Sequence, residues 1–162
     1  MSAIRSLTAK EARELDIEVE MTVFGSQWFR VLLLGPDGSP TGRFEWLRLL
    51  TPAQVTRYPS GGWSIQPVSA DECMALYLEK HRNPVRPTTM WDGSRYSTEI
   101  EATWDMEEEI QRRGLTAEYG SYLIKLVPRG SITENAFAIA HASPEIRCRA
   151  ALLTVRGAKE TA

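Results

Sequence analysis

The sequence has few cysteines and histidines, the residues that most often ligate zinc. Its 162 residues include two cysteines, Cys73 and Cys148, and two histidines, His81 and His141, all far apart along the chain. A zinc site needs three or four ligands that converge, and no CxxC or HExxH spacing is present. We therefore expect the protein to bind no metal and no organic cofactor. Each cysteine lies in an apolar, helix-like stretch, which favours a packing role over a reactive or bridging thiol.

The sequence also lacks long apolar runs and an excess of positive charge. Its unbroken apolar runs, such as Val31–Leu34, are far too short to cross a bilayer, and Met1–Lys10 has no apolar core of signal-peptide length. We therefore expect a cytoplasmic protein that does not associate with membranes. The formal net charge of −2 and the pI of about 5.8 argue against loose electrostatic binding of nucleic acid, although they would allow a local basic patch.

Motifs of common enzyme classes are absent as well. The chain has no P-loop, no dinucleotide-binding glycine motif and no G-x-S-x-G. The glycines of Gly35–Gly42 lie between two predicted strands, which fits a hairpin better than a phosphate-binding loop. Ser143 and His141 could join a distant carboxylate in a triad, but a helix cap explains Ser143 more simply. We expect no enzymatic activity, and a hydrolase that uses His81 and Asp92 is the weakest alternative.

The composition is that of an ordinary globular domain, with 43% hydrophobic and 25% charged residues. We predict a single domain over 1–157, followed by a frayed tail over 158–162. Capping residues, glycine stops and apolar periodicity predict helices over 8–24, 69–80, 97–113 and 143–157. Alternating apolar residues and turn signals predict strands over 28–34, 44–50, 122–127 and 135–141, and a short strand over 63–65.

The predicted helix over 97–113 has two distinct faces. Ile100, Trp104 and Ile110 mark its buried side, so Trp104→Ala is expected to cost about 3–5 kcal/mol of stability. The run Glu107–Glu109 beside Arg112-Arg113 is typical of a solvated face with ion pairs between successive turns, rather than of a paired-carboxylate site.

Three strings of the sequence resemble one family of small phage proteins. The first is Glu14-Leu15-Asp16 with Val19, Val23, Phe24 and Gly25, and the second is Tyr96-Ser97-Thr98-Glu99-Ile100 followed by Trp104. The third is Ala138-Ile139-Ala140-His141-Ala142-Ser143-Pro144 with Ile146, Cys148, Ala150, Ala151 and Leu152. In this order they resemble the phage ABA-sandwich domain family, which is distantly similar to the NinX-like proteins of lambdoid phages.

The resemblance implies an α/β fold of the α+β kind, a three-layer α-β-α sandwich with a mainly antiparallel sheet between helices. It covers about half of the chain and implies a phage or prophage protein without an established activity, so it assigns no functional residues. The segment Ser26–Arg95 is longer than the family leads us to expect and has no counterpart in it. Arg147 and Arg149 flank Cys148 where the family has a simpler apolar step.

The non-periodic stretch from His81 to Tyr96 is the candidate binding site. Its arginines and aromatic residues, Arg82, Arg86, Trp91, Arg95 and Tyr96, are residue types that recur at protein interfaces and that also suit a nucleotide. A loop held down by Trp91, with solvated arginines, is the structural alternative. We expect a non-enzymatic phage or prophage accessory protein that binds a host protein. The alternative is a protein that binds or sequesters a nucleotide-type small molecule.

Overall fold

The computed structural model describes residues 6–57, 62–69, 71–72, 94–127 and 131–160. These residues contain both α-helices and an antiparallel sheet, which confirms the predicted α+β class. The chain clusters into two compact units, one formed by 1–24 with 94–162 and the other by 25–93. The second unit nearly coincides with the segment that has no counterpart in the ABA-sandwich family. The single domain over 1–157 and its three-layer arrangement stay predictions.

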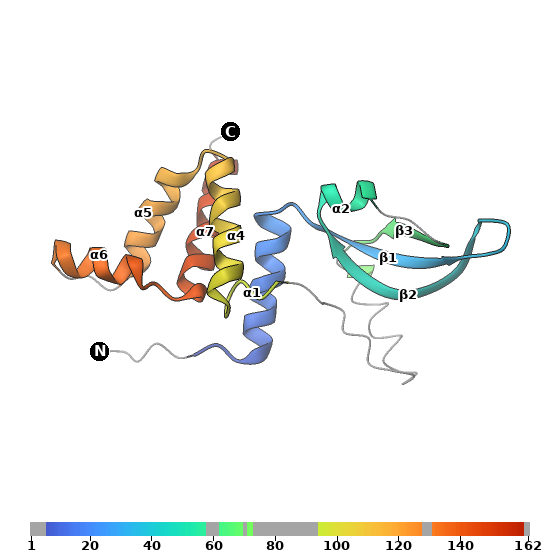
Figure 1. Cartoon of the computed structure of the whole chain (residues 1–162), viewed down its shortest axis with the longest axis horizontal. Coiled ribbons are helices and arrows are strands. Elements are labelled where there is room, and N and C mark those ends of the chain that lie inside the picture. Colours follow the sequence, from blue (N-terminus) through green and yellow to red (C-terminus); the bar gives the residue numbers. More distant parts are fainter. Residues whose placement is uncertain (1–5, 58–61, 70, 73–93, 128–130, 161–162) are drawn as a thin grey trace. The chain divides into compact units, whose positions relative to one another are not determined.

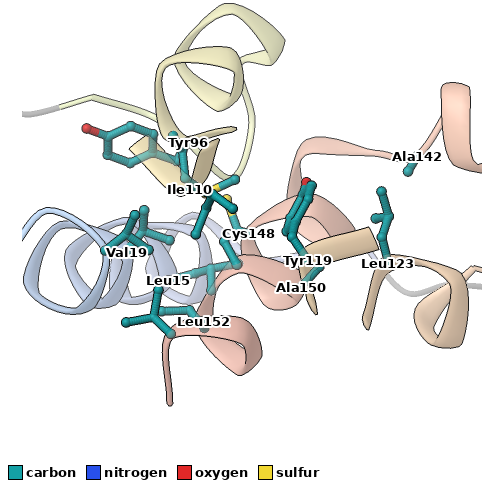
Figure 2. Close-up of a cluster of buried hydrophobic side chains, with 14 of the residues drawn as sticks. Leu15, Val19, Tyr96, Ile110, Tyr119, Leu123, Ala142, Cys148, Ala150 and Leu152 are labelled. Carbon is teal, nitrogen blue, oxygen red and sulfur yellow. The ribbon is translucent and has the colours of Figure 1, made fainter. Parts of the chain in front are cut away.

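The first unit, here called the helical unit, has α7 at its centre. Its helices are α1 (Ala9–Thr22), α4 (Ile100–Arg112), α5 (Thr116–Leu126), α6 (Ile132–Ala140) and α7 (Pro144–Glu160) (Figure 1). Helix α7 packs against α1, α4 and α5. Its small buried residues, Ala151 and the two labelled in Figure 2, Cys148 and Ala150, let the larger side chains of those helices approach closely.

The predicted helix starts at Thr8 and Ser143 are confirmed. Thr8 and Glu11 form a reciprocal capping box before α1, in which each side chain accepts a hydrogen bond from the other residue's backbone N–H. Ser143 Oγ accepts from the N–H of Ile146, 3.4 Å away, at the start of α7. The predicted stop at Gly157 is wrong, because α7 continues to Glu160.

The strands predicted over 122–127 and 135–141 are wrong, because both segments are helical. Tyr119, Leu123 and Val127 are buried at spacings of four, the helical period, so the short alternation over 122–127 was misleading. Helix α6 begins at a capping box between Ser131 and Glu134, a start signal that outweighs the alternation of alanines beyond it.

The buried face of α4 also differs from the prediction. The helix begins at Ile100 rather than near Ser97, and its buried residues are Thr103, Met106 and Ile110. Trp104 and Ile100 are exposed, so of the predicted stripe only Ile110 is in the core. The Thr103 hydroxyl lies within hydrogen-bonding distance of two backbone carbonyl oxygens and can donate its proton to either. This lets a polar residue occupy the buried side of the helix.

The second unit, here called the sheet unit, contains a three-stranded antiparallel sheet. Its strands are β1 (Gln27–Leu34), β2 (Pro40–Leu50) and β3 (Trp63–Pro67), in the order β2-β1-β3 (Figure 1). Phe29 of the central strand is the partner of Arg48 in β2 and of Pro67 in β3. The predicted hairpin and short third strand are thus confirmed, with β2 beginning at Pro40 instead of Phe44.

Two short helical segments accompany the sheet. Helix α2 (Pro52–Arg57), which the sequence analysis does not predict, follows β2 directly and starts at a reciprocal bond pair between Thr51 and Gln54. The predicted capping box of Ser69 and Glu72 is confirmed, whereas the helix predicted beyond it lies outside the described residues. None of the helices in the described ranges is long and apolar enough to span a bilayer.

Candidate functional site

Two of the five predicted binding residues lie within the described residues, and they differ in their surroundings. Arg82, Arg86 and Trp91 lie outside them. Arg95 is exposed and pairs with Glu99 at 3.6 Å. Tyr96 is only 4% exposed and belongs to the core of the helical unit (Figure 2).

Tyr96 joins the end of α1 to the turn that precedes α4. Its ring stacks on Phe24 with the centroids 5.4 Å apart, and its hydroxyl donates to Glu20 Oε1 at 2.8 Å. Burial is the main reason why the pKa of Tyr96 is raised, and the nearby Glu20 carboxylate adds to it. These contacts give Tyr96 a role in holding the fold together.

A second buried contact joins the same two segments. The backbone N–H of Ser97 donates to Asp16 Oδ1 at 2.7 Å, and Ser97 Oγ donates to the carbonyl oxygen of Ala12 at 3.1 Å. Burial raises the pKa of Asp16, while its hydrogen bonds with Ser97 oppose the shift. The resemblance string around Tyr96 and Ser97 therefore forms a structural joint with α1.

The helical unit carries a pocket of about 450 Å³ between α4, α5, α6 and α7. The exposed Trp104, 54% accessible, belongs to its wall. The residues that line the pocket combine apolar side chains with a few polar ones: Trp104, Glu107, Glu108, Ile110, Gln111, Thr116, Tyr119, Leu123, Ile139, Ala140 and Arg147. An exposed tryptophan beside an apolar concavity is typical of a binding surface.

The polar side of this pocket is an internally satisfied network centred on Arg147. Its Nη1 donates to Glu107 Oε1 at 2.5 Å, and the Tyr119 hydroxyl donates to the same oxygen at 2.5 Å. Arg147 also donates to the carbonyl oxygens of Ile139, Ala140 and Ala142. Burial, followed by the bond to Glu107, raises the pKa of Tyr119. The charges of Arg147 and Glu107 therefore neutralise each other.

Helix α4 carries more acidic side chains than its ion pairs use. Glu109 pairs with Arg112 and Arg113, as the sequence predicts, whereas Glu107 is half-buried and pairs with Arg147 on α7. The remaining acids of the helix, Glu101, Asp105 and Glu108, are exposed and form no ion pair among the residues that the structure describes.

Two of the three residues that the sequence offers as nucleophiles or bases within the described ranges, Ser143 and Cys148, occupy structural positions, whereas His141 is exposed. Ser143 caps α7, and the His141 ring lies 4.1 Å from that of Phe137. Cys148 is a free, fully buried thiol, as predicted, and burial raises its pKa. Within the described ranges, no three His, Cys, Asp or Glu side chains gather as a metal site would require. Cys73, His81 and Asp92 lie outside those ranges.

Comparison with known proteins found no matching family model, no similar curated protein and no similar solved structure. The resemblance to the phage ABA-sandwich family therefore rests on the sequence strings alone.

The pocket is absent from the sequence-based prediction because Trp104 was assigned to the wrong face of its helix. The signal that could have found it is the spacing of Thr103, Met106 and Ile110. These three share a face that excludes Trp104.

Proposed function

We propose that this protein is a non-enzymatic phage or prophage accessory protein that binds a host protein in the cytoplasm. The observation that carries the proposal is the exposed Trp104 in the wall of an apolar pocket on the helical unit. Large apolar side chains are costly to leave in water, and tryptophan is enriched among the residues that dominate protein interfaces. The phage setting is supported only by the resemblance of the three sequence strings.

The state of Arg147 favours a protein ligand over a nucleotide at this pocket. A phosphate group needs cations whose donors are free to reach it. Among the described residues that line the pocket, Arg147 is the one cation, and its donors are already directed at Glu107 and at three backbone carbonyl oxygens. Glu107 is neutralised by Arg147, and the exposed carboxylate of Glu108 would repel a phosphate.

The absence of an enzymatic role is supported by the positions of the reactive groups. Ser143 and Cys148 act as a helix cap and a core residue, and neither lines the pocket. The Tyr119 hydroxyl in the pocket is committed to Glu107.

The test is affinity capture from a bacterial lysate with the immobilised full-length protein, followed by quantitative mass spectrometry. We expect one host protein to be enriched by the parent and lost with Trp104→Ala. The matched control is Ile124→Ala on α5, because Ile124 is also 54% exposed but does not line the pocket. A captured set that is identical for the parent and Trp104→Ala would overturn the proposal, as would equal losses with both variants.

A further inference from the structure

The surface next to Trp104 is acidic. Glu101 precedes Trp104 by three residues and Glu108 follows it by four, so both lie on the same face of α4 as the tryptophan. Both carboxylates are exposed, and Glu108 also lines the pocket.

This negative charge is not balanced within the described part of the helical unit. Arg112 and Arg113 are used by Glu109, Arg95 pairs with Glu99, and Arg147 neutralises Glu107. Glu101 and Glu108 have no ion-pair partner among the described residues. The pocket therefore combines an apolar surface and a neutralised polar side with two exposed carboxylates nearby that no described cation pairs with.

We infer that the Trp104 pocket binds a basic amphipathic helix of the partner protein, an inference that rests on the proposed function. A concavity between helices accepts a helix whose apolar residues, spaced three and four apart, enter it. Lysine or arginine side chains beside those apolar residues would then face Glu101 and Glu108, and this complementarity selects the partner by charge.

The same charges argue against a second copy of this chain as the occupant. In a twofold dimer each surface patch meets itself or its immediate surroundings. Two copies joined around Trp104 would bring Glu101 and Glu108 of one copy near the same residues of the other. Like charges that face each other across an interface weaken association.

The experiment uses the full-length protein and two synthetic peptides of about 18 residues, which are long enough to form a helix on binding. Both carry leucines at helical spacing, and one has lysines where the other has glutamates. Binding is followed by NMR through the Trp104 indole N–H, assigned as the signal that Trp104→Phe removes. We expect the lysine peptide to bind and the glutamate peptide not to bind.

The double variant Glu101→Gln/Glu108→Gln should raise the Kd of the lysine peptide by about tenfold, or about 1.4 kcal/mol. The effect should shrink as salt screens the charges. The matched control is Glu118→Gln/Glu160→Gln, two exposed acids of the same unit that do not line the pocket, which should leave the Kd unchanged.

Three results of the peptide experiment would overturn the inference: equal binding of both peptides, no binding of the lysine peptide, or an unchanged Kd for the pocket double variant. Sedimentation that shows self-association abolished by Trp104→Ala would instead identify a second copy as the occupant and also overturn it. If the peptides fail while capture of a host protein still depends on Trp104, the basic-helix inference is wrong and the proposed function stands. If that capture fails too, both fall.

Discussion

Arg147 Nη1 lies 2.5 Å from Glu107 Oε1, and this ion pair joins α7 to α4. The same guanidinium donates to the carbonyl oxygens of Ile139 and Ala140, the last two residues of α6. The final carbonyl groups of a helix lack partners within the helix, so Arg147 satisfies groups that would otherwise be left unpaired. One side chain thus connects three helices.

We expect Arg147→Ala to lower the free energy of unfolding by about 2–4 kcal/mol, because it leaves Glu107 and the α6 carbonyl groups without their donor. Urea denaturation measures this loss. The matched control is Arg149→Ala, which removes a pair between an exposed arginine and Glu145 on the same helix and should cost less than about 0.5 kcal/mol. Equal losses for the two arginines would contradict the role assigned to Arg147.

Truncation of Trp104 and truncation of Ile110, both on α4, should reduce stability by very different amounts. Trp104 is 54% exposed, so Trp104→Ala should change the free energy of unfolding by less than about 1 kcal/mol, instead of the larger loss expected from the sequence. Ile110 is 1% exposed, and Ile110→Ala should cost about 2–4 kcal/mol through the cavity it leaves. Chemical denaturation of both variants decides the matter, and a larger loss for Trp104→Ala would mean that the helix faces the other way.

Asp16 should make stability depend on pH. Burial raises its pKa above the usual 3.8, so the folded protein holds this proton more tightly than the unfolded chain does. Asp16 therefore favours folding at low pH, and its contribution is lost as the pH rises from about 4 through its folded pKa. Asp16→Asn removes the charge and keeps an acceptor for the Ser97 N–H. We expect the stability of Asp16→Asn relative to the parent to increase with pH over that window.

The comparison variant is Asp16→Ala, which leaves the buried N–H of Ser97 without its acceptor. Near pH 4 it should be about 1–3 kcal/mol less stable than Asp16→Asn. Thermal or urea unfolding at several pH values gives both quantities. A constant difference between Asp16→Asn and the parent would show that Asp16 has no raised pKa.

Gly157→Ala should stabilise the protein less than a Gly→Ala change in a helix usually does. A Cβ at Gly157 would lie 3.0 Å from the Tyr122 hydroxyl oxygen, closer than side chains normally approach. Alanine in a helix interior is favoured over glycine by about 1 kcal/mol, so the contact should cancel much of that gain. In a Tyr122→Phe background the hydroxyl is gone, and Gly157→Ala should stabilise by about 1 kcal/mol. Equal effects in both backgrounds would rule out the contact.

Local signals predicted several elements of the fold correctly, and longer-range packing decided the others. The caps at Thr8, Ser69 and Ser143 and the turn over 35–39 involve residues within three or four positions, so the sequence alone is sufficient for them. The apolar pattern of the six residues 122–127 is too short to distinguish a strand from a helix. Contacts with α7, which are distant in sequence, select the helix.

The candidate site was less predictable for the same reason. Which face of α4 is buried depends on Thr103, whose hydroxyl is satisfied only once Tyr96 and Glu99 are in place. Arg147 and Glu107 are forty residues apart, and no local pattern pairs them. Arg95 was correctly expected at the surface, but Tyr96 beside it was not recognised as a core residue.

The stacking of Phe24 on Tyr96 has a consequence for how the segment between these two residues can change in evolution. These two residues stand close to the points where the chain leaves the helical unit and returns to it. Contacts within the helical unit already hold these two points together. The sheet unit is therefore an insertion into a helical unit whose own contacts do not depend on it. The entropic cost of lengthening such a segment grows only slowly with its length. Homologues would then be free to shorten, exchange or omit the sheet unit while they keep the helices that carry the Trp104 pocket.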